Sequence, residues 1–307
     1  MRTTRCNASK LCATCEGAEE KVTKCQVCFR HCELSEGQYG VCGARVASGG
    51  QVVAKNYGRI TSIALDPIEK KPLRRFMPGS MILSVGSYGC NLRCPFCQNS
   101  EISWGEGVER WEESADVVEP EQLVRVAEKY QNEGNIGIAY TYNEPLVGYE
   151  FVRDTAKIAH HKGLKNVLVT NGTAELSVLR EIGPYIDAMN IDIKCFSESI
   201  YKDVLGGSLA MTKAFVSEAV KIAHVELTCL AVPGISAEKE MMREMVSWVA
   251  SLQDGNGRVI GEEVPFHVSR FFPRFQMTDA KATAVKDVYA LAAIAREKLK
   301  YVYTGNC

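Results

Sequence analysis

Apolar and polar positions follow two alternating periodicities along most of the chain. Short apolar runs rich in β-branched residues predict strands at 81–86, 135–141, 165–170, 188–194, 225–232 and 265–272. Apolar residues at helical spacing predict helices at 119–134, 151–159, 176–182, 211–224, 238–252 and 279–298. A last run at 300–306 predicts an edge strand. Such alternation predicts an α/β fold of parallel strands with right-handed crossovers, as either a doubly wound sheet or a barrel.

Residues 1–80 do not follow this alternation. They are rich in cysteine and glycine, and only 50–65 carries a pattern that predicts short strands. The two prolines within 65–76 predict an extended connector across the surface of the following domain. We therefore expect a small N-terminal module with its connector over 1–80, and the α/β domain over 81–307.

Composition narrows the class of protein. Of 307 residues, 46% are hydrophobic and 24% are charged, which is typical of a water-soluble globular chain. No apolar run has the length of a membrane span, and the first residues lack the apolar stretch of a secretory signal. A net charge of −1 without a basic block argues against nucleic-acid binding. We expect a cytoplasmic protein.

Thirteen cysteines stand out in such a chain, because thiols in a reducing compartment bind metals more often than they form disulfides. Three of them form the motif Cys90-x3-Cys94-x2-Cys97 directly after the strand predicted at 81–86. A zinc knuckle or three buried thiols would be an alternative, but structural zinc needs four ligands and no histidine is near. A 4Fe–4S cluster held by three cysteines keeps one iron open for another ligand.

With Phe96 before the third cysteine, this motif resembles the signature of the radical S-adenosylmethionine superfamily. The resemblance implies a partial (β/α)6 barrel of the TIM type. It also implies reductive cleavage of S-adenosylmethionine to methionine and a 5′-deoxyadenosyl radical, which abstracts hydrogen. The later segments resemble the glycyl-radical activating enzymes, such as those of pyruvate formate-lyase. Over roughly 25–306 the chain resembles the AmmeMemoRadiSam-system radical enzymes, through 66–73, 76–80, 89–99, 265–273 and 300–306.

The resemblance implies cofactor contacts at the ends of successive strands. Glu144 resembles the acidic residue that accepts the ammonium group of S-adenosylmethionine, although Tyr142 and Asn143 replace the usual glycines. Glu144 alone is equally typical of a helix cap. The full set of implied contacts is Phe96, Asn99, Glu144, Thr170, Asn171, Asp192, Lys194, Val232 and Pro233. His267 and Arg270 are candidate groups on the substrate side, and His267 is equally typical of a buried core histidine.

A second cysteine set lies near the N-terminus. Cys25, Cys28, Cys32 and Cys42 offer four thiolates, which predicts structural zinc in preference to a fully ligated iron–sulfur cluster. His31 could replace one of these cysteines. Of three further cysteines, Cys12 and Cys15 could form an alternative ribbon with Cys25 and Cys28 or bind a second metal. Spacing does not decide between these, and Cys6 has no assigned role.

We therefore expect an oxygen-sensitive oxidoreductase that abstracts hydrogen from a protein or peptide and receives electrons from a flavodoxin or ferredoxin-type reductant. Alternatives within the same chemistry are modification of a small molecule or RNA, and a transferase that cleaves a different sulfonium bond. An alternative from another class is a metal-binding or electron-transfer module without catalysis. Release of 5′-deoxyadenosine would exclude the non-catalytic module, and 5′-methylthioadenosine would indicate the transferase.

Overall fold

The computed structural model describes residues 22–307, so the predictions for Cys6, Cys12 and Cys15 lie outside the described residues. Its centre is a sheet in which seven parallel strands lie side by side in chain order. They are β7 (Met81–Gly86), β9 (Asn135–Tyr140), β10 (Lys165–Thr170), β11 (Ala188–Asp192), β12 (His224–Ala231), β13 (Phe266–Arg270) and β14 (Val302–Gly305). Because the order never reverses, right-handed crossovers place every connecting helix on one face, and the sheet curls into a partial barrel.

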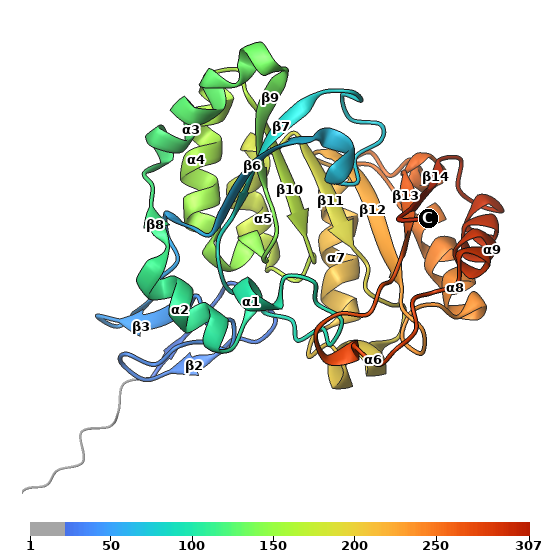
Figure 1. Ribbon diagram of the computed structural model, residues 1–307, viewed down its shortest axis with the longest axis horizontal. Helices are drawn as coiled ribbons and strands as arrows, with labels where there is room; N and C mark the ends of the chain where they lie inside the picture. The colour runs from blue at the N-terminus through green and yellow to red at the C-terminus, as the bar shows by residue number, and fades with distance from the viewer. Residues whose placement is uncertain (1–21) are drawn as a thin grey trace, which may run out of the picture.

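The connecting helices cover the outer face of this sheet (Figure 1). They are α3 (Pro120–Lys129), α4 (Tyr149–His161), α5 (Leu176–Ile182), α7 (Leu209–Ala219), α8 (Lys239–Ala250) and α9 (Val285–Arg296). Glu119 and Gln122 form a capping box at the start of α3, and Pro120 occupies its first turn, as expected for a helix N-terminus. The predicted α/β fold is confirmed, and the barrel form is the one that the resemblance implies. Within residues 22–307 no helix combines the length and apolar character that crossing a bilayer requires.

Shorter helices complete the connections. At the carboxyl-terminal ends of the strands lie α1 (Ser100–Ser103), α2 (Glu106–Ser114) and α6 (Glu198–Asp203), at the bottom of Figure 1. The 3-10 turns are η1 (Ile68–Lys70), η2 (Gln131–Glu133), η3 (Pro145–Gly148), η4 (Gly183–Tyr185), η5 (Gly261–Glu263) and η6 (Phe275–Met277). The carboxyl-terminal edge, where α1, α2 and α6 lie, is the edge at which α/β barrels build their active sites.

The predicted connector does not run across the surface. Its first part is β6 (Ser62–Pro67), which pairs antiparallel with β7 and forms one edge of the main sheet. Ile68 and Leu73 are fully buried and pack with Ile82 and Val167 at the amino-terminal ends of the strands. The prediction of a surface connector is wrong because these two apolar side chains close the base of the barrel.

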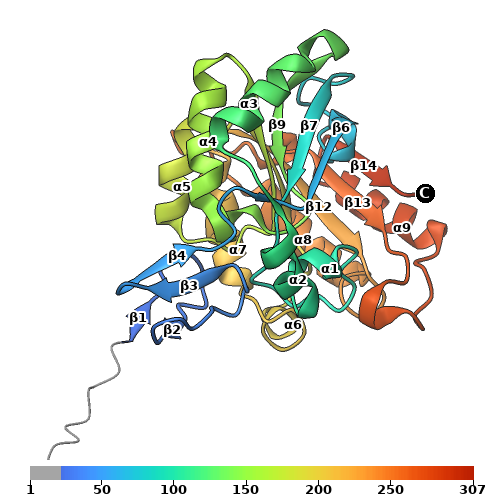
Figure 2. The same ribbon diagram turned by 60° about the vertical axis from the view of Figure 1, so that its left-hand side comes forward.

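The segment before β6 forms short strand pairs near the carboxyl-terminal ends of the barrel strands (Figure 2). These are β1 (Thr23–Lys24) with β2 (Glu33–Leu34) and β3 (Arg45–Ser48) with β4 (Gln51–Ala54), whereas β5 (Arg59–Ile60) pairs with β8 (Asp116–Val117), which follows α2. The carbonyl oxygen of Val27 accepts a 2.9 Å hydrogen bond from the amide of Glu175, beside α5. Arg45 is buried and pairs with Glu150 of α4 at 2.7 Å. The division at residue 80 stays a prediction.

Candidate active site

The loop between β7 and α1 carries the three-cysteine motif at the carboxyl-terminal edge of the barrel. None of its thiols is in a disulfide; Cys94 is buried, and Cys90 and Cys97 are partly buried. The amide of Cys97 donates a 3.2 Å hydrogen bond to the carbonyl oxygen of Cys94, which turns the chain between the last two cysteines. Asn171 lies next to Cys90, with its Nδ2 3.9 Å from the sulfur. The loop therefore presents three soft donors beside the end of β10.

The donor set of this loop fits a three-cysteine iron–sulfur cluster. Burial raises the pKa of the Cys90 thiol, and the nearby Glu144 and Cys94 raise it further. Burial also raises the pKa of Cys94 to about 12, although Lys194 opposes this. Such thiols ionise when a cationic group binds them. Within residues 22–307 no three His, Cys, Asp or Glu side chains converge on a single ion. A cubane does not require this, because each of its cysteines binds a different iron.

Glu144 joins the second and third strands of the site. It caps η3, because its Oε1 accepts a 3.1 Å hydrogen bond from the amide of Leu146. The same oxygen accepts a 2.7 Å bond from Thr170 Oγ1, and Oε2 accepts a 2.8 Å bond from the amide of Asn171. Burial raises the pKa of Glu144 to about 7 despite these donors. The helix-cap interpretation is confirmed, and the buried carboxylate also favours a neighbouring cation.

Asp192 and Lys194 lie beside the same loop. Lys194 Nζ donates a 2.7 Å hydrogen bond to Asp192 Oδ2, and both side chains are mostly shielded from solvent. The pKa of Lys194 is raised, because Asp192 and Cys94 outweigh the effect of burial. Lys194 in turn acts on the pKa of Glu144. The structure therefore brings together the cysteine loop after β7, Glu144 after β9 and the Asp192–Lys194 pair at the end of β11, and the end of β10 lies between them.

The remaining cofactor candidates surround this group. Phe96 and Val232 are buried in one apolar cluster with Cys94, whereas Pro233 is exposed. Asn99 lies on the other side of the loop, where its Nδ2 donates a 2.7 Å hydrogen bond to the carbonyl oxygen of Tyr142. The site thus has a polar part and an apolar part.

Sequence reasoning did not identify Asn91, which lies between the first two cysteines. It is buried, its Nδ2 donates a 2.8 Å hydrogen bond to Thr173 Oγ1, and its Oδ1 accepts a 2.9 Å bond from Asn171 Nδ2. These bonds fix the loop to the end of β10. The signal in the sequence was an amide side chain inside the cysteine motif. A buried amide needs hydrogen-bond partners, so an asparagine at this position indicates contacts with a neighbouring segment.

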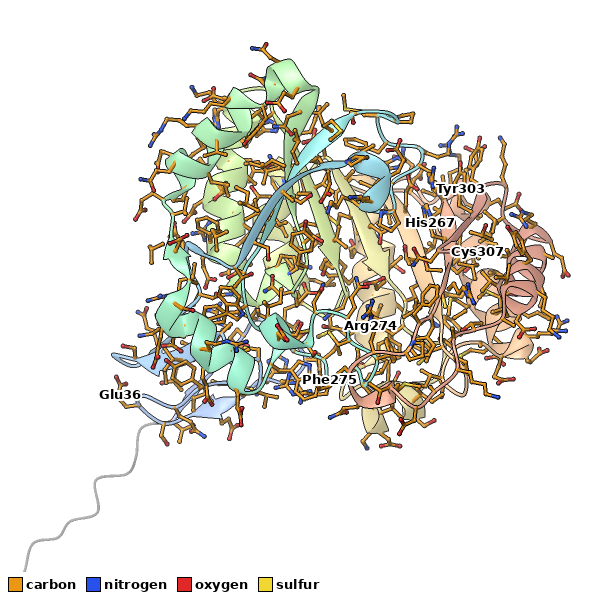
Figure 3. All side chains as sticks on the ribbon, viewed as in Figure 1. Glu36, His267, Arg274, Phe275, Tyr303 and Cys307 are labelled. Carbon is orange, nitrogen blue, oxygen red and sulfur yellow. The ribbon has the colours of Figure 1, made fainter. Side chains whose placement is uncertain are left out.

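The structure does not bring His267 to the site. His267 is the second residue of β13, and its Nε2 lies 2.7 Å from Glu226 Oε2 in the interior. It stacks on Tyr303, and Figure 3 shows both well away from Arg274 and Phe275 at the other end of the barrel. This position agrees with the core-histidine interpretation, because its partner is a carboxylate of the core. Arg270 ends β13, and its Nε donates a 2.7 Å hydrogen bond to the carbonyl oxygen of Thr283.

Comparison with known proteins decides the family. The sequence model of the Radical SAM superfamily matches residues 84–246, more than half of the chain. The chain belongs to the radical SAM superfamily. Membership implies an enzyme that uses a 4Fe–4S cluster and S-adenosylmethionine.

Relatives of this radical SAM protein agree with that assignment. A Methanocaldococcus jannaschii protein of uncharacterized function is 37% identical over 294 residues, covering 95% of this chain and 83% of the relative. The pyruvate formate-lyase 1-activating enzyme of Escherichia coli is 25% identical over 185 residues, covering 58% of this chain and 71% of the relative. SuiB of Streptococcus suis, solved with S-adenosylmethionine, has a TM-score of 0.53 at 12% identity, covering 72% of this chain and 48% of SuiB. The SuiB likeness shows the fold.

The N-terminal cysteines of this radical SAM protein lie next to its cluster loop. Cys25, Cys28 and Cys42 are buried, Cys32 is partly buried, and all four thiols are free. Burial raises the pKa of Cys28 to about 11, and Cys42 and Cys25 raise it further. The sulfurs of Cys32 and Cys42 both face Gly40. Four soft donors gather in one region, which suits a metal, but within residues 22–307 they do not converge on one ion. Zinc here stays a prediction.

His31 is occupied by other partners. Its Nδ1 lies 3.3 Å from the carbonyl oxygen of Cys25, and its Nε2 lies 2.9 Å from Glu175. The four cysteines are therefore the better donor set for this second site.

Proposed function

We propose that this protein cleaves S-adenosylmethionine reductively at a cluster held by Cys90, Cys94 and Cys97, and abstracts hydrogen from a peptide or protein. The observation that carries the proposal is the grouping of three free thiols with Glu144 and Lys194 at the carboxyl-terminal edge of the barrel. When bound, the cluster supplies the electron that splits the sulfonium and leaves methionine and a 5′-deoxyadenosyl radical. The protein binds, orients and shields these groups.

Each part of the site has a role in this proposal. Glu144 accepts the ammonium group of the cofactor, because its buried carboxylate gains a cationic partner. Lys194, which pairs with Asp192, would bind the carboxylate of the cofactor. Phe96 and Val232 form an apolar wall for the adenosine and exclude water from the cleaved bond.

A peptide substrate is supported by two kinds of relative. The pyruvate formate-lyase activating enzymes are similar over more than half of the chain, and SuiB is described bound to a precursor peptide. An electron donor of the flavodoxin or ferredoxin class supplies the reducing equivalent. We also propose that Cys25, Cys28, Cys32 and Cys42 hold a structural zinc, because these four free thiols match the number of ligands that a tetrahedral zinc needs.

The test is anaerobic reconstitution with iron and sulfide, followed by S-adenosylmethionine and a strong reductant. We expect about four irons at the main cluster and release of 5′-deoxyadenosine. Cys94→Ala removes one ligand and should lose both, whereas Cys307→Ala, at an exposed cysteine, should keep both. 5′-Methylthioadenosine as the product would indicate a transferase, and absence of any cleavage would contradict the proposal.

A further inference from the structure

A cavity of about 440 Å³ opens beside the cluster loop. It is lined by 97–102, which runs from the last cysteine through most of α1, and by Ser62, Tyr142, Arg274 and Phe275. Its volume lies in the range of small-ligand pockets. The proposed cluster ligand Cys97 and the proposed cofactor contact Asn99 belong to the lining, whereas Glu144 and Lys194 do not, so the cavity borders the cofactor site.

The segment after β13 reaches back to the cluster loop to form one wall. The amide of Gln276 donates a 3.0 Å hydrogen bond to the carbonyl oxygen of Pro95. The ring of Phe275 packs edge-on against Trp104, with centroids 4.8 Å apart. Figure 3 shows Arg274 and Phe275 at this end of the barrel. The wall is therefore attached to the loop that carries the cysteines.

Two aromatic residues of the lining adopt left-handed backbone conformations, Tyr142 with φ +73° and Phe275 with φ +50°. Tyr142 is held there by its hydroxyl, which donates a 3.0 Å hydrogen bond to Asp66 Oδ2, and by Lys71 Nζ 4.7 Å from its ring. Left-handed conformations are unfavourable for residues with side chains, and they persist where surrounding contacts enforce them, often at ligand sites.

Arg274 brings a positive charge to this cavity. Its side chain is exposed, and no ion pair within residues 22–307 involves it. Glu101 also lines the cavity, but no ion pair joins it to Arg274 among the described residues. The guanidinium group is a planar fork that binds carboxylates through two hydrogen bonds. The cavity thus offers the cation of Arg274 and the carboxylate of Glu101, which form no ion pair with each other among the described residues, beside the neutral side chains of Ser62 and Gln98.

We propose that this cavity binds a carboxylate-bearing segment of the substrate, and that Arg274 pairs with the carboxylate. This inference rests on the proposed hydrogen abstraction from a peptide. A carboxylate of a peptide comes from glutamate, aspartate or the C-terminus, so the substrate class is an acidic peptide segment. The cofactor's own carboxylate is the competing ligand, and the position of Lys194 away from the lining favours the substrate.

Chemical modification of arginine tests the proposal on the reconstituted full chain with S-adenosylmethionine present. Phenylglyoxal modifies accessible arginines, and mass spectrometry reads the rate at Arg274. The probes are acetyl-Gly-Glu-Gly-amide and the matched acetyl-Gly-Gln-Gly-amide. We expect the glutamate peptide, when it occupies most of the site, to slow modification of Arg274 about fivefold, and the glutamine peptide to have no effect. Arg258, whose side chain is 79% exposed on a distant turn, is the control and should react equally in all samples.

Three outcomes would overturn the proposal. One is no protection by the glutamate peptide, another is equal protection by both peptides. The third is protection by S-adenosylmethionine alone, relative to a peptide-free sample without the cofactor, which would assign Arg274 to the cofactor. Arg274→Gln provides a second reading: it should abolish peptide retention in equilibrium dialysis and leave the affinity for S-adenosylmethionine unchanged. Release of 5′-deoxyadenosine from the same preparation is measured separately, so failure of the proposed function is distinguishable from failure of this inference.

Discussion

The backbone amide of Cys90 donates a 3.2 Å hydrogen bond to the carbonyl oxygen of Cys42. Cys42 is the last of the N-terminal cysteines and Cys90 is the first of the cluster loop, so the two cysteine-rich segments are in direct contact. Arg30 adds a second link, because its Nε donates a 2.8 Å bond to the carbonyl oxygen of Asn91 and its Nη2 a 2.7 Å bond to that of Gly206. The N-terminal segment therefore helps to set the backbone of the cluster loop.

This contact predicts a strong effect of Gly89→Ala. Gly89 has φ +92°, and an added Cβ would lie 2.6 Å from Ala44 Cβ and 2.8 Å from the carbonyl oxygen of Cys42. Gly79→Ala is the matched control, because Gly79 has φ +82° and open space around it. We expect Gly79→Ala to cost about 1 kcal/mol from the backbone alone. Gly89→Ala should cost about 3 kcal/mol or more, because the clash adds to that.

Denaturant unfolding and iron analysis of the reconstituted variants measure both effects. Gly89→Ala should also lower the iron content, because it displaces Cys90 from its position beside Cys42. Equal stability and equal iron in the two variants would show that the contact between the segments does not matter for the cluster loop.

The N-terminal cysteines give a second prediction. Cys28→Ala should remove the second metal and lower Tm by roughly 5–10 °C, because the binding free energy of a structural metal adds to the free energy of folding. Iron at the main cluster should largely remain. Cys195→Ala, at a buried free cysteine outside both sets, is the control and should keep both metals. Metal analysis by mass spectrometry and calorimetry give the readouts, and equal loss of iron from the main cluster would instead indicate that the two sites assemble together.

Most of the barrel could be predicted because its strands are buried on both faces. The apolar runs at 81–86 and 165–170 coincide with β7 and β10, whose residues are almost all shielded from solvent. β6 gave only a weak pattern, because it is an edge strand with exposed residues and an antiparallel partner. The burial of Ile68 and Leu73 was missed since two neighbouring prolines suggested a loop, and only the tertiary fold shows that this loop closes the barrel.

The candidate site was predictable where its chemistry is local in sequence. The cysteine spacing alone places three thiols on one loop, and the structure keeps them there. The role of Asp66 in holding Tyr142, and the approach of Arg274 to the cysteine loop, depend on contacts between distant segments that no spacing encodes. For His267 the sequence left two interpretations open, because a residue within a predicted strand gives no sign of which end of the barrel its side chain occupies.

The buried carboxylate of Glu144 predicts a separation between cluster assembly and cofactor binding. Glu144→Gln removes the negative charge, so the affinity for S-adenosylmethionine should fall by about 10- to 100-fold through loss of a charge-assisted hydrogen bond. Iron content should be unchanged, because Glu144 is not a proposed ligand. Glu101→Gln is the control, since Glu101 lies near the loop but outside the cofactor candidates. Equilibrium dialysis of the cofactor measures the effect, and an unchanged affinity would remove Glu144 from the cofactor site.

Glu226 predicts how stability depends on pH. Its side chain is fully buried, and burial opposes its ionisation. Hydrogen bonds with His224 and His267, and from the amides of Arg74 and Arg75, outweigh this and lower its pKa from 4.5 to about 2. Because the pKa is depressed, the stabilisation is present above pH 4.5 and is lost as pH falls toward 2. The shift corresponds to about 3 kcal/mol of folding free energy at neutral pH.

Glu226→Gln should therefore be less stable than the parent chain at pH 7 by about 3 kcal/mol, with a difference that shrinks below pH 4.5. Urea unfolding at pH 7, 5 and 3.5 measures it. Glu263→Gln is the control, because the Glu263 side chain is 71% exposed and should contribute little at any pH. A stability difference between Glu226→Gln and the parent that stayed constant from pH 7 to 3.5 would contradict this prediction. It would show that the negative charge of Glu226 does not stabilise the contacts of 74–75 with β12 and β13, and that the loss in the variant comes from the different shape of the glutamine side chain.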